Sequence, residues 1–265
     1  MENDTTLRER PIALVAAMND ELRHALDRMD RHTSERVGPW TLHHGSLAGK
    51  AIVAVVTGIG MVNAAAAVTA LLTREDPRAV LNFGCAGAHR EDIHPGDVII
   101  GSGAVAHLSL TILPTGEERY VGFRYQVDDQ TVLSDVIEAD SHLLEIAHAA
   151  SQNWRPDRWP WSTTDRDQGE VHVGVVASAD CWTQDPVRIG GLHDLHASLC
   201  EDMEAAAIAQ VCAMFKVPMI AIKDISNNEL HVASSQGVDF PSLEAVSSEV
   251  GARAFALAQR IIEHL

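Results

Sequence analysis

The feature that most constrains this chain is the regular alternation of β-branched apolar runs with segments of helical periodicity. Several of the apolar runs are continuous, which is typical of strands that are covered on both faces. Strands are expected at 12–18, 51–58, 79–84, 97–105, 171–178 and 217–224, and helices at 19–30, 61–74, 141–151, 203–215 and 242–264. This alternation predicts an α/β fold built from βαβ units.

The chain has 265 residues, enough for one large α/β domain or two small ones. It contains no internal repeat and no linker that would mark a boundary, so we expect a single domain over 1–265. Two segments break the pattern. The segment 108–132 and the Trp- and Pro-rich segment 151–169 are expected to be loops or insertions with little regular structure.

Charge and targeting signals exclude several classes of function. Acidic residues outnumber basic ones by 37 to 20, giving a formal charge of −17, and there is no Lys/Arg cluster suited to a nucleic acid backbone. The N-terminal residues are charged where a signal peptide needs an apolar core, and no apolar run approaches a membrane span. We therefore expect no nucleic acid partner, no membrane association and a cytoplasmic location. The 4 cysteines are scattered without a CxxC pair and are expected to be reduced thiols.

Small residues and polar clusters follow the predicted strands. Glycine-containing or small-residue turns occur at 57–67, 82–90 and 178–185, where backbone N–H groups can approach a ligand. Each turn alone would be an ordinary βα connection, but three together favour a pocket. The last predicted strand, in the stretch KVPMIAIKDISNN (216–228), ends in polar side chains, which is where α/β proteins place ligand sites. The turn GIGMVNA lacks the dinucleotide-binding glycine pattern, so a Rossmann dehydrogenase is set aside.

These segments resemble the nucleoside phosphorylase/nucleosidase superfamily, most closely the 5′-methylthioadenosine/S-adenosylhomocysteine nucleosidases. The matching pieces occur in the family's order: IALVAAMNDEL, VTGIGMVNAAAAVTALL, VLNFGCAGA, HPGDVIIG, VVASADCWTQ and EDMEAAAIAQVCAMFKVPMIAIKDISN. The run Asp202-Met203-Glu204, leading into a small-residue helix, is the most specific of them. The resemblance implies a three-layer α/β/α domain with a mixed central sheet, and a homo-oligomer, either a dimer or larger.

The resemblance also implies roles for individual residues. Glu21 matches the glutamate that deprotonates the attacking water; without the resemblance it would be an ordinary first-turn helix carboxylate. Glu204 matches the acceptor of the ribose 2′ and 3′ hydroxyls, and Met203 the apolar wall beneath the sugar. Trp182 lies where the family stacks an aromatic ring on the purine; a buried structural aromatic is the alternative.

Further positions depart from the nucleosidase pattern. Cys85 replaces a serine near the water and sugar, and Lys223 replaces an arginine and is expected to be catalytic. Both changes lose hydrogen-bonding geometry. Gly87 and Ser226 are expected to line the substrate site. Asn227 replaces the aspartate that protonates nitrogen 7 of the departing adenine, a step that an amide cannot perform.

Asn227 leaves the identity of the base open. Asparagine at this place resembles the 6-oxopurine members, including futalosine hydrolases and purine nucleoside phosphorylases. Losing a general acid costs roughly 10²–10⁴ in rate, so either the base has changed or the acid has moved. Asp224 and Asp180 are the candidates for a moved acid, although a role in stabilising the fold is favoured for Asp224.

Water is favoured over phosphate as the nucleophile. The two arginines with which phosphorylases hold phosphate are absent, and Asn82 stands at one of their positions. Glu21 suits a water nucleophile and would repel a phosphate dianion. The expected function is hydrolysis of the N-glycosidic bond of a purine nucleoside, a small-molecule substrate, with no metal or organic cofactor.

Two other functions stay open on the sequence alone. One is a nucleoside phosphorylase that uses phosphate. The other is a non-catalytic nucleoside-binding protein, because Cys85, Lys223 and Asn227 depart from the hydrolase pattern together. The sequence does not define the 5′ substituent, since the resemblance implies that this pocket is built from the divergent region 108–132 and from a neighbouring subunit.

Overall fold

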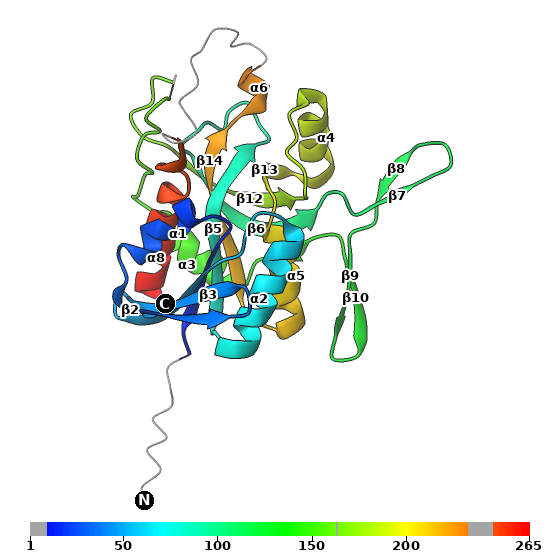
Figure 1. Ribbon diagram of the computed structural model, residues 1–265. Helices are drawn as coiled ribbons and strands as arrows, with labels where there is room; N and C mark the ends of the chain where they lie inside the picture. The colour runs from blue at the N-terminus through cyan, green and yellow to red at the C-terminus, as the bar shows by residue number, and fades with distance from the viewer. Residues whose placement is uncertain (1–9, 163, 233–245) are drawn as a thin grey trace, which may run out of the picture.

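The computed structural model describes residues 10–162, 164–232 and 246–265. Its central sheet (Figure 1) is built from β1 (Ile12–Ala16), β2 (Asp30–Val37), β3 (Trp40–Leu47), β4 (Lys50–Val56), β5 (Ala79–Ala88), β6 (Val98–Ala106), β11 (Ile137–Glu138), β12 (Val171–Ser178), β13 (Ser198–Asp202) and β14 (Met219–Asn227). The helices around it are α1 (Asn19–Leu26), α2 (Met61–Glu75), α3 (Ser141–Ser151), α4 (Pro186–His196), α5 (Ala205–Phe215), α6 (Glu229–Val232) and α8 (Ala252–His264).

The sheet is mixed, as expected. Its strands follow the order β11-β6-β12-β13-β5-β1-β4-β3-β2, and β14 pairs with both β5 and β6. The pairings of β5 with β1 and β14 are parallel, whereas β13 runs antiparallel to β5 and β14 antiparallel to β6. Because β14 connects β5 to β6, strands β5, β14, β6, β12 and β13 form a closed ring of pairings. The ends of β5, β13 and β14 therefore meet at one place.

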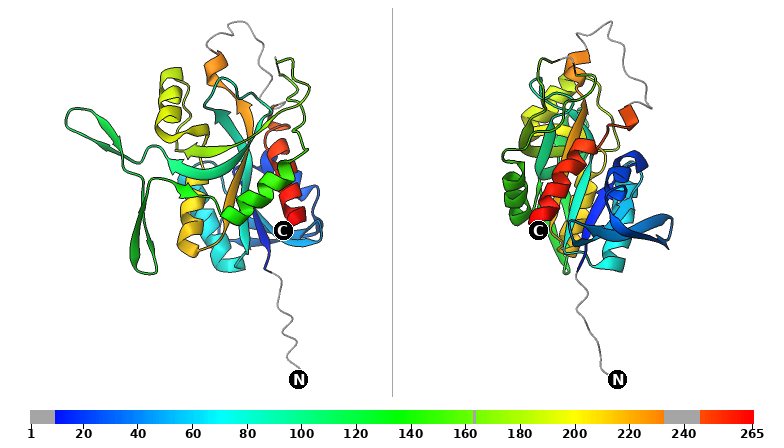
Figure 2. Two further views of the ribbon diagram at one scale, coloured as in Figure 1. Left: turned by 180° about the vertical axis from the view of Figure 1, so that it is seen from behind. Right: turned by 90° about the vertical axis from the view of Figure 1, so that its left-hand side faces the viewer.

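Two apolar cores lie on the two faces of this sheet. In β1, Ala13 and Val15 pack with α2 and α5, whereas Ile12 and Leu14 pack with α1, α3 and α8. Successive side chains of a strand point to opposite faces, so a strand buried on both faces must be apolar throughout. Figure 2 shows α3 and α8 side by side over one face. The three-layer α/β/α architecture expected from the sequence is confirmed.

All six expected strands and all five expected helices are present, with boundaries shifted by a few residues or, for α8, more. Helix α8 begins only at Ala252; of the expected residues before it, 242–245 lie outside the described part. The segment 151–169 is largely irregular, as expected, with an isolated bridge between Asp157 and Gln168. Among the described residues, no helix is long and apolar enough to cross a membrane.

The expectation of little regular structure in 108–132 is wrong. This region forms two hairpins, β7 (Leu110–Ile112) with β8 (Glu118–Tyr120) and β9 (Phe123–Val127) with β10 (Gln130–Ser134), which project from the body of the protein (Figure 1). Strands β2, β3 and β13 and helix α4 were also not predicted. Strand β2 is exposed along most of its length and carries polar residues on both faces, so it has no hydrophobic period to read.

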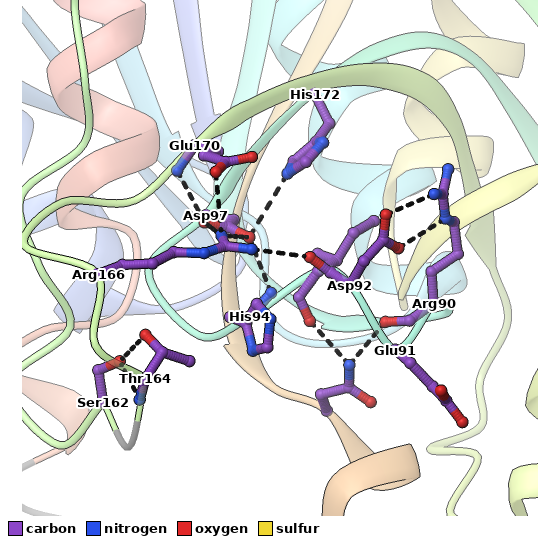
Figure 3. A network of polar contacts seen from close by, with 12 residues as sticks. Arg90, Glu91, Asp92, His94, Asp97, Ser162, Thr164, Arg166, Glu170 and His172 are labelled. Carbon is purple, nitrogen blue, oxygen red and sulfur yellow. Dashed lines mark hydrogen bonds and ion pairs between the residues drawn. The ribbon is translucent and has the colours of Figure 1, made fainter.

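A buried carboxylate ties the irregular segment after α3 to the sheet (Figure 3). One oxygen of Asp97 accepts hydrogen bonds from the backbone N–H of His94, at 2.8 Å, and the other from that of Glu170, at 2.7 Å. Arg166 Nη1 lies 3.2 Å from both oxygens, and His172 Nε2 lies 3.4 Å from Oδ2. The network joins the start of β6, the segment before β12 and β12 itself.

Candidate active site

A cavity of about 300 Å³ lies where β5, β13 and β14 end. Parallel strands that end in polar residues commonly hold ligands in such a place. Eight of the nine site residues expected from the sequence line this cavity. They are Glu21, Cys85, Gly87, Trp182, Met203, Glu204, Ser226 and Asn227.

Glu21 is buried, with 2% of its surface exposed, and its carboxylate is held by backbone groups. One oxygen accepts from Cys85 N at 2.8 Å, and the other from Ala17 N and Met18 N, each at 3.0 Å. The approach to β5 requires glycine at position 84, because a Cβ there would lie 2.5 Å from Glu21 Oε1. The carboxylate is thus fixed at the cavity wall, at the first turn of α1.

Glu204 also lines the cavity and follows β13 closely in the chain. Its Oε1 accepts a hydrogen bond from Gly60 N at 2.8 Å. Burial, and after it the nearby Asp202 carboxylate, raise the pKa of Glu204 to about 7. The charge on this group is therefore sensitive to its surroundings near neutral pH.

Lys223 is the one expected site residue that does not line the cavity. Its ammonium is buried and lies 2.7 Å from Asp202 Oδ2. Burial alone would lower the pKa of Lys223, but the Asp202 and Glu204 carboxylates raise it, so the side chain is charged. Asp202 also accepts hydrogen bonds from Ser178 Oγ and from Ala205 N at the start of α5. The ion pair thus holds Asp202, the residue that precedes Met203 and Glu204, at the start of α5.

Asn227 is oriented by its two neighbours. Its Oδ1 accepts from Ser226 Oγ at 2.8 Å, and its Nδ2 donates to Glu229 Oε1 at 3.0 Å. A primary amide has two N–H groups and two acceptor lone pairs, so one of each remains available toward the cavity.

Part of the remaining wall is apolar or neutral. Met203 and Trp182 line it, and Trp182, 66% exposed, lies at its rim. The alternative of Trp182 as a buried structural aromatic is therefore wrong. Burial raises the pKa of the Cys85 thiol, and the Glu21 carboxylate adds to that effect, so Cys85 is a neutral thiol.

The two candidates for a moved acid do not line the cavity. Asp224 is buried against α8, where its Oδ2 accepts from Arg253 N at 3.1 Å, and burial raises its pKa to about 7. Asp180 accepts from Met61 N at 2.7 Å and caps the start of α2. Both side chains are used by the fold.

Sequence reasoning missed four polar residues of the cavity wall, which are His89, Thr183, Glu201 and Glu229. Glu201 belongs to β13, a strand that was not predicted. In the sequence it precedes the motif Asp202-Met203-Glu204, and no pattern distinguishes it as a site residue. Glu229 lies two positions after Asn227 in the sequence, and this closeness to an expected site residue could have predicted it.

One group of side chains has the spacing of metal ligands. The ligand atoms of Glu35, His44 and Glu75 lie within 4.8 Å of one another. These residues belong to β2, β3 and α2, and none of them lines the cavity.

The fold and the cavity define a class of protein: an α/β/α domain with a cavity at the strand ends that is lined by fixed carboxylates. The sequence model of the phosphorylase superfamily matches residues 11–263. The chain belongs to this superfamily.

Nucleosidases are among the proteins that it resembles. The 5′-methylthioadenosine/S-adenosylhomocysteine nucleosidase of Bacillus thuringiensis (strain Al Hakam) is 30% identical over 240 residues, which cover 89% of this chain and 95% of that protein. The Streptococcus pneumoniae enzyme, solved with the transition-state inhibitor MT-ImmA, superposes with a TM-score of 0.73 at 25% identity, covering 96% of this chain and 98% of that one. A futalosine hydrolase of Helicobacter pylori has the same fold, with a TM-score of 0.76 at 20% identity, covering 97% and 99%. The protein is accordingly an N-glycosidase.

Proposed function

We propose that this protein hydrolyses the N-glycosidic bond of a purine nucleoside, with water as the nucleophile. The observation that carries the proposal is the charge of the cavity wall. Five carboxylates line it, and no lysine or arginine does among the described residues; the residues are Glu21, Glu201, Asp202, Glu204 and Glu229. Residues 233–245 contain no lysine or arginine either. Such a wall would repel a phosphate dianion but can deprotonate water.

Glu21 is the proposed general base. Its three backbone hydrogen bonds fix the carboxylate while leaving acceptor capacity for a water molecule. As the C–N bond lengthens, positive charge develops on the ribose, and the neighbouring carboxylates stabilise that charge. The base leaves with the electron pair of the C–N bond and takes up a proton from solvent, while water attacks the anomeric carbon and gives one proton to Glu21.

Glu204 is the proposed anchor of the sugar. A carboxylate can accept from the 2′ and 3′ hydroxyls at once, and Gly60 N holds one of its oxygens in place. Met203 provides the apolar surface beneath the ribose, and Trp182 at the rim offers an aromatic face to the base. Lys223 acts as a positioning residue, since it contacts Asp202 rather than the cavity.

The base is the finer part of the proposal. The relatives are named for 5′-methylthioadenosine and S-adenosylhomocysteine, and a nucleoside of that kind is one candidate. Asn227 favours a 6-oxopurine or futalosine-type substrate instead, because its amide cannot protonate an adenine leaving group. It can still donate a hydrogen bond to an oxopurine.

A nucleoside panel tests the reaction. Adenine and hypoxanthine nucleosides with varied 5′ groups would be incubated with and without phosphate, and free base, free ribose and ribose 1-phosphate would be measured. We expect free ribose and no stimulation by phosphate. Ribose 1-phosphate would show a phosphorylase, and nucleoside binding without base release would show a non-catalytic binding protein.

Replacing Glu21 by glutamine tests the base. We expect kcat to fall by roughly 10²–10⁴ while binding of the product base is retained. Glutamine also places an NH₂ group against one of the backbone donors, so a lower melting temperature should accompany the loss. Glu145→Gln on the exposed face of α3 is the matched control. Turnover by Glu21→Gln at the wild-type rate would remove Glu21 from this role.

We also propose that residues 1–265 form one domain that acts as a homo-oligomer. Two cores on the two faces of one sheet support the single domain. The homo-oligomer is supported by the projecting hairpins, which expose the apolar side chains Ile112 and Leu133.

A further inference from the structure

A buried polar cluster forms part of the cavity wall. Its centre is Glu201, which is 8% exposed. Glu201 Oε1 accepts from Thr183 Oγ1 at 3.0 Å and lies 3.5 Å from His107 Nε2, while Oε2 lies 3.4 Å from His89 Nε2. Neither the water nor the sugar chemistry described above uses this cluster.

The cluster fixes Glu201 as a carboxylate. Burial would raise its pKa, but contacts with His107, His89 and Thr183 outweigh burial and lower it to about 2. The Ser198 hydroxyl donates to Leu192 O at 3.2 Å and so accepts from His89 Nδ1 at 2.8 Å. His89 Nε2 faces the carboxylate, so the imidazole is held between Ser198 and Glu201. Glu201 is therefore an anionic group that can only accept hydrogen bonds.

The strand register places Glu201 and Asn227 on either side of a gap. Gly87 of β5 is the partner of Glu201 on β13 and of Asn227 on β14. Directly opposite residues point to the same face of a sheet, and adjacent strands are about 4.8 Å apart, so the two Cα atoms are roughly 10 Å apart. Gly87 has no side chain between them, and a Cβ there would lie 3.2 Å from Asn227 Nδ2. The row Glu201–Gly87–Asn227 thus leaves a slot suited to the edge of a flat ring.

The two sides of the slot differ in hydrogen-bonding chemistry. The Glu201 side accepts only, and its Oε2, which faces His89 alone, keeps a spare lone pair. The Asn227 side has one N–H and one acceptor lone pair left. A 6-oxopurine presents an N–H at position 1 and acceptors at oxygen 6 and nitrogen 7. An adenine presents an acceptor at position 1, which a carboxylate would repel.

We propose that Glu201 is the specificity-determining residue of this site and selects a 6-oxopurine by accepting the hydrogen bond of its N1–H. Asn227 then donates to oxygen 6 or nitrogen 7 across Gly87, and His89 and His107 keep Glu201 in place. The proposal rests on the proposed nucleoside hydrolysis and names the class of base that leaves. The proposal explains why position 227 is an asparagine, because recognition of an oxopurine at this site needs no protonated aspartate.

The Glu201→Gln variant tests this inference. Glutamine keeps the size of the side chain, but its amide presents an N–H where only acceptors stood. We expect kcat/KM for inosine-type substrates to fall roughly 10–100-fold, while activity on adenine nucleosides is unchanged or higher. Glu138→Gln, an exposed glutamate of β11, is the matched control and should change neither. An equal effect on both bases would overturn the proposal.

Binding of free bases separates this inference from the proposed reaction, because it needs no catalysis. Titration calorimetry on the wild-type protein should give tighter binding of hypoxanthine than of adenine. 1-Methylhypoxanthine, which lacks the N1–H, should bind at least tenfold more weakly than hypoxanthine. This comparison also decides the matter if Glu201→Gln does not fold. Equal affinities would refute the role of Glu201 even if hydrolysis occurs, whereas the expected order without any hydrolysis would refute only the proposed reaction.

Discussion

At the scale of single residues, the charge of Glu204 is set by what surrounds it, and this predicts how substrate binding varies with pH. Burial and Asp202 raise its pKa to about 7, and only the ionised form can accept two sugar hydroxyls. The ionised fraction rises about tenfold from about pH 6 to about pH 8, so KM should fall by up to that factor as pH rises. Steady-state kinetics across this range measure the effect.

Two controls accompany the Glu204 prediction. A 2′,3′-dideoxynucleoside has no hydroxyls for Glu204, so its KM should lack this pH dependence. Glu204→Gln should raise KM, lower kcat and remove the dependence for the ribonucleoside, because contacts to the sugar tighten as charge develops on it. A KM that stays constant with pH for the wild-type protein and the ribonucleoside would contradict the assignment.

Asn227→Asp predicts a change in the preferred base. The introduced carboxyl would lie beside Glu229, which now accepts a hydrogen bond from Asn227 at 3.0 Å. Two carboxylates that share a site cannot both ionise easily, so one of the two pKa values should rise above the ~3.9 of a free aspartate. The variant should therefore gain activity on adenine nucleosides at mildly acidic pH and lose the gain as pH rises.

The same change should be neutral or harmful on an oxopurine substrate, because a carboxylate has no N–H for oxygen 6. Base release from both nucleosides, followed as a function of pH, provides the measurement. Equal activity of the wild-type and variant proteins on adenine nucleosides at every pH would mean that another residue supplies the proton.

Site residues that belong to a recurring sequence motif could be predicted from the sequence. Site residues that reach the cavity only through the pairing register of the strands could not. Glu21, Glu204 and Asn227 follow predicted elements in a recognisable order, and all three line the cavity. Glu201 reaches it only because β13 runs antiparallel to β5 and places it opposite Gly87. Lys223 was expected in the site, but it lies on the strand face that meets Asp202.

At the scale of elements, the Asp97 network predicts how firmly the irregular segment before β12 is attached. Burial raises the pKa of Asp97, but hydrogen bonds from His172, His94 N and Glu170 N outweigh burial and lower it below its ordinary 3.8. Its contribution to stability is therefore present above about pH 4 and is lost as pH falls through the lowered pKa. Asp97→Asn should lower the stability at neutral pH by about 1–3 kcal/mol.

Thermal unfolding of wild type and Asp97→Asn at neutral and acidic pH checks this, and the difference between them should shrink in acid. Asp92→Asn is the control, because its carboxylate pairs with Arg90 at an exposed position and such pairs contribute little. A neutral-pH melting temperature of Asp97→Asn equal to that of the wild type would show that Asp97 does not hold the segment.

Elements with a buried face were predictable because burial imposes a period on the sequence. The helix α2 and the strand β1 are examples. The hairpin β7–β8 has largely exposed faces within this chain, so no core imposes a period on its residues. In β9–β10, Phe123 is buried in the core and Tyr125 packs against it, whereas much of the rest of the hairpin is exposed.

At the scale of the whole molecule, these hairpins predict self-association. An isolated two-stranded hairpin is marginally stable in water. Both hairpins project from the body (Figure 1) and expose Ile112, Val121 and Leu133 at 67%, 52% and 72%. Apolar side chains on a projecting arm are best covered by a second copy of the chain, as the homo-oligomer expected for this superfamily would provide.

Light scattering after gel filtration should therefore give a mass of at least twice 28.7 kDa for the wild-type protein. Leu133→Asp and Ile112→Asp place a charge in the proposed contact and should shift the protein toward the monomer, more strongly on dilution. Val187→Asp is the matched control, because Val187 is 83% exposed but belongs to α4 rather than to the arms. The prediction is contradicted if the wild-type protein is monomeric at all concentrations. It is also contradicted if the hairpin variants keep the full assembly, because the hairpins would then not form the contact between subunits.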